Sequence, residues 1–202
     1  MISVLSVVLN NTLYGYGEEM SLAVYGIINR LMFFANFPVL GMVQGFLPIA
    51  GFNFGAKKFG RVREVILKSI SWGTGISFII FSFILFFAKD LSAIFTNEQE
   101  MINQTAPALI AVFLATPTLV MQLIGSAYYQ SIGKALPALF LSLLKQGIFL
   151  IPLILILPRY FGLNRVWYSF PIADLGTAII NFFFLRYAYQ KLAVEEEESF
   201  KD

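Results

Sequence analysis

Long uncharged runs of apolar residues alternate along the chain with short segments that carry charges, glycine or proline. A helix needs roughly 20 mostly apolar residues to cross a hydrocarbon core of about 30 Å. Five runs reach that length and end at charged or turn residues. They predict membrane-spanning helices over Ser21–Ala50, Lys68–Ala88, Gln104–Ser131, Leu136–Leu157 and Val166–Tyr189.

A sixth apolar segment opens the chain. Met1–Gly17 is uncharged, but it lacks the basic start and the small-residue cleavage site of a signal peptide. We therefore interpret it as a span without its first turns. Together the runs predict an all-α fold, a polytopic membrane bundle of about six helices. The bundle would fill residues 1–192, and 193–202 would form a solvated acidic tail.

Composition supports a lipid environment and excludes several kinds of chemistry. Hydrophobic residues make up 58% of the 202 residues and charged residues 13%, far from the balance of a soluble domain. The chain has no His and no Cys, which excludes Cys/His metal sites and Ser-His-Asp or Cys-His catalysis. We expect no enzyme, no bound metal and no organic cofactor. A net charge of +2 without a basic stripe argues against a nucleic-acid partner.

Lys and Arg residues in the short loops predict the orientation, because they accumulate on the cytoplasmic side. The densest cluster lies in the 51–68 loop, which we expect to be cytoplasmic together with the C-terminal tail. The loops at 16–20 and 89–100 then lie outside, and they carry mostly acidic residues. Arg159 and Arg165 oppose this pattern in a third outside loop.

Three charged residues fall inside predicted spans. Burying a charge in a bilayer is costly and usually marks a cavity or a pathway. At 1.5 Å of rise per residue, Arg30 lies about 13 Å, Asp174 about 12 Å and Lys145 about 18 Å from the outer ends of their spans. Asp174 could therefore pair with Lys145 or with Arg30. The pair could hold a protonatable carboxylate for ion coupling, or it could be a structural ion pair that fixes helix register.

Uncharged polar residues recur at helical spacing on several spans. Gln122 shares a helix face with Ser126, and Asp174 shares one with Thr177. Such stripes either line a wet cavity or form hydrogen bonds between helices, and both interpretations stay open. The further candidates for the substrate and ion pathway are Asn10, Asn11, Asn36, Gln146 and Asn181.

Aromatic residues gather in one predicted span. Phe33, Phe34 and Phe37 lie close together between residues 21 and 50. They would suit promiscuous contacts and cation–π attraction to drug cations. The alternative is that they pack against lipid.

Three stretches, in this order, resemble one family of transporters. Residues 44–58 (QGFLPIAGFNFGAKK) resemble the link between the second and third helices of a lobe in multidrug and toxic compound extrusion (MATE) transporters. Residues 130–135 (QSIGKA) with 144–152 (LKQGIFLIP) are similar to the link between the fourth and fifth helices, and 166–174 (VWYSFPIAD) to the last helix. The positions that carry this resemblance are Gln44, Gly45, Pro48, Gly51, Asn53, Gly55, Gly133, Lys134, Pro152 and Pro171.

The resemblance implies a two-lobe antiporter that exports organic cations and other drugs in exchange for H+ or Na+. It implies that this chain is the C-terminal six-helix lobe, that a second lobe is its partner, and that it lies in a cell membrane, the bacterial inner membrane. Some family members place carboxylates on the first and fourth helices of this lobe to bind the coupling cation. Here the comparable regions offer Asn10, Asn11 and Gln122, so the resemblance supplies no sodium site in this lobe.

Two other functions remain open from the sequence. The wider superfamily contains flippases of lipid-linked precursors, whose cavities would need several cations for a pyrophosphate, and Arg30 and Lys145 are the available ones. The chain could also be a truncated fragment that does not transport. Dye accumulation in cells and loss of a cell-surface polymer on deletion would separate these functions.

Overall fold

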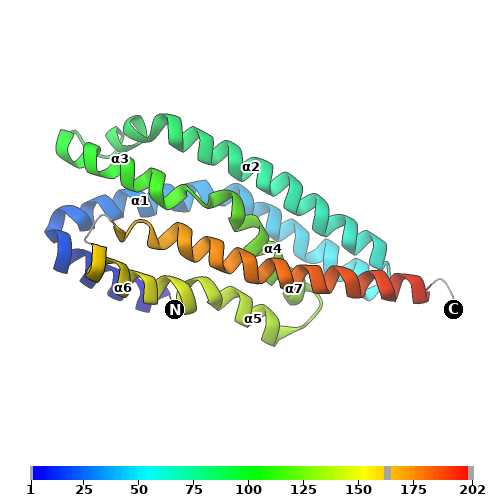
Figure 1. The fold of residues 1–202 in the computed structure, drawn as a ribbon. Coiled ribbons are helices and arrows are strands. Elements are labelled where there is room, and N and C mark those ends of the chain that lie inside the picture. Colours follow the sequence, from blue (N-terminus) through cyan, green and yellow to red (C-terminus); the bar gives the residue numbers. More distant parts are fainter. Residues whose placement is uncertain (1, 162–164, 200–202) are drawn as a thin grey trace.

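The computed structural model describes residues 2–161 and 165–199 and is a bundle of long helices that lie roughly side by side (Figure 1). No strand occurs in those two ranges. A 3-10 turn, Thr116–Thr118, joins α3 to α4, and a π-helix, Leu144–Leu150, joins α5 to α6. The α-helices are α1 (Ile2–Gly55), α2 (Phe59–Ala93), α3 (Gln99–Phe113), α4 (Leu119–Ser131), α5 (Ala135–Leu143), α6 (Ile151–Phe161) and α7 (Ser169–Ser199).

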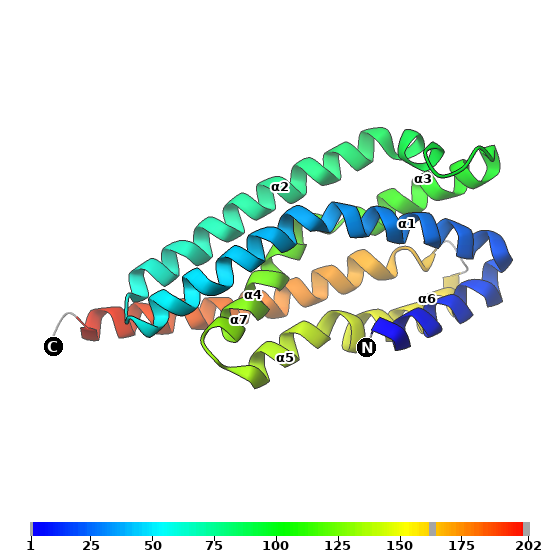
Figure 2. The same ribbon diagram turned by 180° about the vertical axis from the view of Figure 1, so that it is seen from behind.

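Helix α1 contains two of the predicted spans. Its first part doubles back on the rest, so the two parts run antiparallel within one continuous helical assignment (Figures 1 and 2). The first part lies beside α6 in both views. The segments 2–17 and 21–50 therefore act as two elements of the bundle, although no loop separates them.

Within the part of the chain that the structure describes, four helical stretches are long and apolar enough to cross a membrane, which confirms the polytopic membrane bundle. The other two predicted spans correspond to the first part of α1 and to α7. Helix α7 has the length, but polar residues such as Asp174 and Asn181 reduce its hydropathy. The four stretches are Glu19–Gly55, Phe59–Ala93, Gln99–Ser131 and Ala135–Tyr160.

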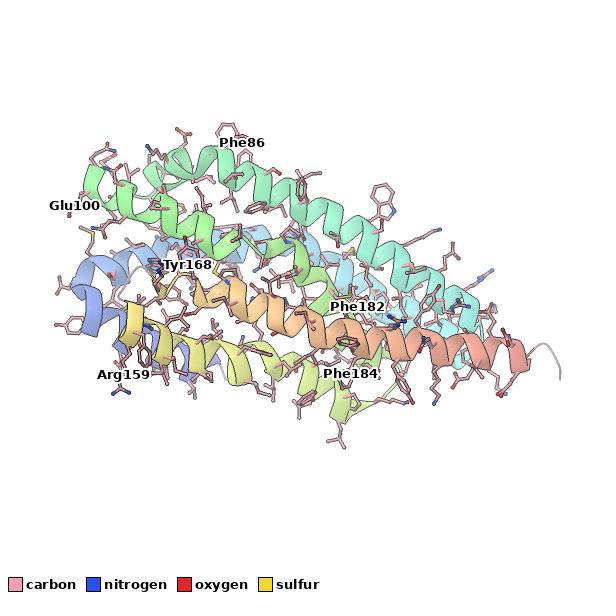
Figure 3. All side chains as sticks on the ribbon, in the orientation of Figure 1. Phe86, Glu100, Arg159, Tyr168, Phe182 and Phe184 are labelled. Atoms are coloured by element: carbon pink, nitrogen blue, oxygen red, sulfur yellow. The ribbon has the colours of Figure 1, made fainter. Side chains whose placement is uncertain are left out.

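Large apolar side chains cover the outside of the bundle. Phe86 is 78% exposed and Phe182 44% exposed, and both stand out from the ribbon in Figure 3. Exposed apolar surface on this scale marks contact with a membrane or a partner rather than with water. Lipid, or a partner within the membrane, is therefore expected to cover this surface.

The interior contains two apolar clusters, one toward each end of the bundle. The first includes Leu109 and Ala173, and the second includes Ile124 and Leu185. Helix α7 passes through both clusters. Its polar positions beginning with Asp174 come directly after the first cluster, where the packing changes from one apolar group to the other.

Helices α1 and α4 end in the same kind of turn, the Schellman motif, in which the residue after the helix is left-handed. That residue is Lys57 in the first turn, with φ 56°, and Gly133 in the second, with φ 75°. A glycine has no Cβ to clash in this conformation, whereas a lysine does. The closing hydrogen bonds run from the Lys58 amide to the Asn53 carbonyl and from the Lys134 amide to the Tyr129 carbonyl, both at 2.9 Å.

These two turns give a matched stability prediction. Gly133→Ala should lower the free energy of unfolding by about 1 kcal/mol, and Lys57→Gly should raise it by up to about 1 kcal/mol. Lys57→Ala is the control, because it removes the charge but retains a Cβ. Thermal unfolding of the purified chain in detergent measures all three. A gain in stability from Lys57→Ala as large as that from Lys57→Gly would contradict the conformational explanation.

The segment that the sequence suggested as an acidic tail is helical as far as the structure describes it. Helix α7 continues to Ser199. The Arg63 guanidinium pairs with Glu196 at 3.0 Å and lies 4.3 Å from the centre of the Tyr189 ring. These contacts fix the start of α2 against the end of α7. The sequence pattern did not predict these contacts, because a run of Glu residues does not indicate a partner 133 residues away in the chain.

Candidate functional site

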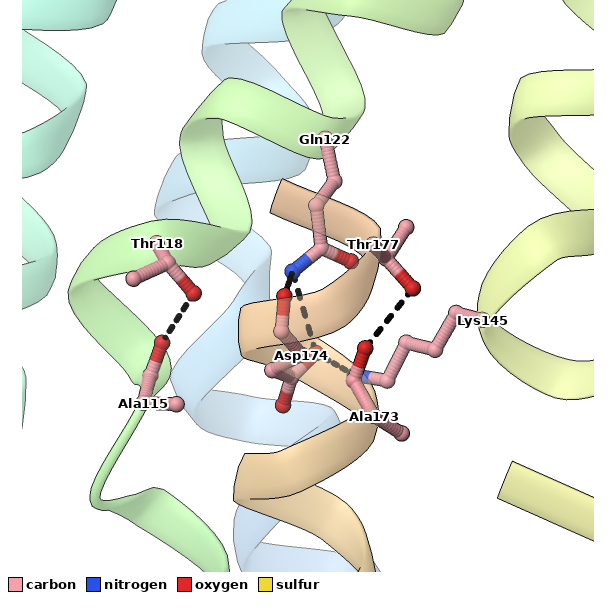
Figure 4. A network of polar contacts seen from close by, with 7 residues as sticks. All are labelled: Ala115, Thr118, Gln122, Lys145, Ala173, Asp174 and Thr177. Atoms are coloured by element: carbon pink, nitrogen blue, oxygen red, sulfur yellow. Dashed lines mark hydrogen bonds and ion pairs between the residues drawn. The ribbon is translucent and has the colours of Figure 1, made fainter. Parts of the chain in front are cut away.

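A carboxylate, an ammonium group and an amide meet inside the bundle (Figure 4). The Lys145 Nζ lies 2.6 Å from Asp174 Oδ1. The Gln122 Nε2 donates to the same Oδ1 at 3.1 Å and to the backbone carbonyl of Asp174 at 3.0 Å. Three helical elements, α4, the π-helix and α7, thus converge on Asp174. The structure joins this carboxylate to Lys145 and not to Arg30.

The π-helix that carries Lys145 has a local cause in the sequence. Pro152 is the second residue after this segment and has no N–H to continue the i→i−4 ladder, and its ring crowds the preceding turn. A wider π turn relieves this kind of conflict, and such turns are frequent at functional sites. The irregular turn places Lys145 against α7.

The two charges of the pair differ in how far they reach the surface. The Asp174 side chain is 4% exposed and the Lys145 side chain is 20% exposed. Lys145 lines a cavity in the bundle, whereas Asp174 is not among the lining residues. The pair therefore presents its cation to the cavity and holds its carboxylate behind it.

The cavity has a volume of about 970 Å³ and lies between α1, α4, α5, the π-helix and α7. Its apolar lining includes Phe33 and Phe34, whose rings meet edge to face at 6.4 Å. This volume lies at the upper end of the range for drug-sized ligands, about 300–1,000 Å³. The polar and charged residues of its wall include Asn10, Asn29, Arg30, Asn36, Gln122, Ser126, Gln130, Ser142, Lys145, Gln146 and Thr177.

The structure thus brings most of the predicted pathway residues to one cavity. The exceptions are Asn11, Asp174 and Asn181, which do not line it. Sequence reasoning missed Asn29 and Ser142, which do. Asn29 directly precedes Arg30 in the sequence, and its position beside a charged residue in a predicted span could have marked it as a pathway candidate.

After Asp174, polar side chains of α7 form hydrogen bonds to backbone carbonyls of the same helix. The Thr177 hydroxyl donates to the Ala173 carbonyl at 2.7 Å, and the Asn181 amide donates to the Thr177 carbonyl at 2.9 Å. Within the described residues, the Asn181 Oδ1 is buried without a partner. A Cβ on Gly125 of α4 would overlap that oxygen. Helices α4 and α7 thus approach closely just beside the Gln122–Asp174 contact.

The residues that carry the sequence resemblance to MATE transporters lie mainly at positions that support the helical framework. A Cβ on Gly51 would lie 2.9 Å from the Ser131 carbonyl, so this glycine allows α1 to approach the end of α4. The Asn53 amide donates to the Ile49 carbonyl at 2.8 Å in the last turn of α1. Three of the residues on α1 are exposed, Gln44, Gly45 and Pro48, and Gly55 ends this helix. Lys134 precedes α5. Pro152 is exposed at the start of α6, whereas Pro171 is buried in the first turn of α7.

Comparison with known proteins identifies the family. The family model described as MatE matches residues 1–156. The chain belongs to the MatE family. It is 28% identical over 198 residues to the multidrug export protein MepA of Staphylococcus aureus strain MSSA476. That match covers 95% of this chain and 42% of MepA, so the MatE chain spans less than half the length of this relative.

Solved structures show the same fold. The MatE chain aligns with a MATE family transporter in an outward-facing conformation with a TM-score of 0.89 and 22% identity, over 95% of this chain and 43% of that one. An inward-facing conformation gives 0.89 and 23%, over 95% and 44%. The arrangement of helices here is therefore that of one lobe, and it matches both conformations equally well.

Proposed function

We propose that this chain is the C-terminal lobe of a secondary active antiporter that exports drugs and organic cations in exchange for H+ or Na+. The observation that carries the proposal is the buried Asp174–Lys145 pair at the wall of a cavity of about 970 Å³ inside a membrane bundle. A buried ion pair in a membrane must offset a large desolvation penalty, so it adds little stability in itself. Its place at a cavity that can hold a substrate favours a role in transport.

Alternating access follows from how such lobes move. In transporters built from repeats, one lobe rocks against the other around a central site. The similarity to outward-facing and inward-facing structures supports a lobe that keeps its internal arrangement during this motion. A second lobe, in the same polypeptide or in another one, would complete the cavity. In the bacterial inner membrane, the 51–68 segment and the C-terminus would face the cytoplasm.

A second candidate is a flippase of lipid-linked precursors. The observation that favours it is that Arg30 and Lys145 both line the cavity, where they could hold the phosphates of such a precursor. The third candidate, a fragment without transport activity, makes no use of the cavity.

Ethidium accumulation in cells that express this lobe together with its second lobe tests the proposal. Expression should lower the accumulation, and Asp174→Asn should abolish this effect. A protonophore or removal of sodium then identifies the coupling ion. Unchanged ethidium accumulation together with loss of a cell-surface polymer on deletion would favour the flippase. No change in either would favour the fragment without transport activity.

A further inference from the structure

The charges that face the cavity are positive. Among the described residues that line it, Arg30 and Lys145 are the charged ones, and none is a carboxylate. The carboxylate that pairs with Lys145, that of Asp174, is 4% exposed and lies behind the ammonium group. A ligand in this cavity therefore meets cations first.

The charge of this wall is also unbalanced. Asp174 compensates Lys145 at 2.6 Å. Arg30 belongs to none of the ion pairs in the described part of the chain, which leaves one positive charge in excess. Arg30 is exposed and lines the cavity, so a ligand can reach its guanidinium. An anionic group that binds beside Arg30 would balance this charge.

The geometry of the donors suits an oxyanion. A guanidinium presents its N–H groups in a planar fork that matches carboxylate, sulfonate and phosphate oxygens. The Lys145 ammonium has three donors, and its ion pair with Asp174 occupies one. The amides of Asn29 and Asn36 line the same cavity and can donate further hydrogen bonds.

The apolar part of a ligand has a place close to these groups. Phe33 and Phe34 follow Arg30 by three and four residues on α1, so they lie on the same side of the helix. Both line the cavity. A ligand with a charged group at Arg30 can therefore place an aromatic or aliphatic body on these rings.

We propose that this lobe recognises amphipathic organic anions, with a carboxylate, sulfonate or phosphate group held by Arg30 and Lys145 and an apolar body against Phe33 and Phe34. The inference rests on the proposed function, in which this cavity is the substrate site, and it narrows the substrate class: drugs that carry an anionic group should be preferred over purely cationic drugs such as ethidium. A substrate may carry a cationic group as well, provided that its anionic group faces this lobe. A different explanation of Arg30, pairing with a carboxylate of a second lobe, is an outcome of the test.

The test compares two probes of equal shape and opposite charge, 2-naphthoate and 2-naphthylmethylammonium. Their binding to the full chain in phosphatidylcholine nanodiscs is measured by calorimetry. Naphthoate should bind at least tenfold more tightly than naphthylmethylammonium. Arg30→Gln should weaken naphthoate binding tenfold or more. Arg159→Gln is the matched control, because Arg159 is an exposed arginine that does not line the cavity.

The outcomes separate this inference from the proposed function. Tighter binding of naphthylmethylammonium, with export of this probe from vesicles, would overturn the inference and leave the proposed exporter intact. Naphthoate binding that Arg30→Gln does not change would also overturn it and would favour pairing of Arg30 with a second lobe. If neither probe binds, both the inference and the use of this cavity as a substrate site are wrong. Competition from added phosphatidylglycerol would support the anion site and identify a lipid headgroup as the anion.

Discussion

Asp174→Asn should abolish transport, with at least a tenfold loss of ion-driven efflux, whereas Asp174→Glu should retain part of it. The Asn variant removes the carboxylate and leaves the Lys145 ammonium without the partner that lies 2.6 Å from it. Breaking one side of a buried ion pair typically costs about 3–5 kcal/mol. The Glu variant keeps the charge but moves it by one methylene group. Ethidium efflux from cells or vesicles measures both variants.

Folding must be measured beside transport for this prediction. The amount of each variant in the membrane and its unfolding temperature show whether it is assembled. Glu98→Gln is a suitable control, because Glu98 is an exposed acid that lies outside the cavity. Efflux by Asp174→Asn at the wild-type rate would show that the carboxylate is not needed for transport.

Gly125→Ala should destabilise the chain by about 1–3 kcal/mol, although an alanine in a helix interior usually adds stability. A Cβ at this position would overlap the Asn181 Oδ1, and Asn181 is fully buried. The overlap would separate α4 from α7 one turn away from Gln122, whose amide binds Asp174. Both the unfolding temperature and the efflux rate should therefore fall.

The same clash predicts a specific rescue. In an Asn181→Ala background, Gly125→Ala should cost at least about 1 kcal/mol less than in the wild type, because the overlapping oxygen is gone. Gly75→Ala is the matched control, because a Cβ at Gly75 would meet nothing within 4 Å. Equal costs of Gly125→Ala in both backgrounds would show that the two residues are not coupled. Thermal unfolding in detergent of the wild type, the two single variants and the double variant completes the double-mutant cycle.

The length of the apolar runs was sufficient to predict the membrane bundle, since crossing lipid imposes a minimum length on each helix. The run 68–88 falls within α2, and the runs 104–131 and 136–157 fall within successive helical stretches. The breaks inside those stretches were not predicted. The Thr116–Thr118 turn and the Leu144–Leu150 π-helix depend on how a proline acts on its neighbouring turns, which hydropathy does not report.

The partner of Asp174 could not be chosen from the sequence. Estimated depths of about 12 Å for Asp174, 13 Å for Arg30 and 18 Å for Lys145 left both partners open, because depth counts only the rise along each helix. The π-helix and the rotation of each helix about its axis decide the contact, and they bring Lys145 to the carboxylate. Helical spacing placed Gln122 with Ser126 on one helix face and Thr177 with Asp174 on another, and it left open whether such faces line a cavity. In the structure Gln122, Ser126 and Thr177 line the same cavity.

The claim that the Asp174–Lys145 pair works in transport is tested most directly by a variant that removes both charges. In Lys145→Met with Asp174→Asn no charge is left unpaired, so a purely structural pair would be replaced at little cost. The measurement is ion-driven ethidium efflux by this double variant at wild-type membrane levels. Our account predicts an assembled protein without coupled efflux. Efflux restored to the wild-type rate would contradict it and would show that the pair only holds the helices together.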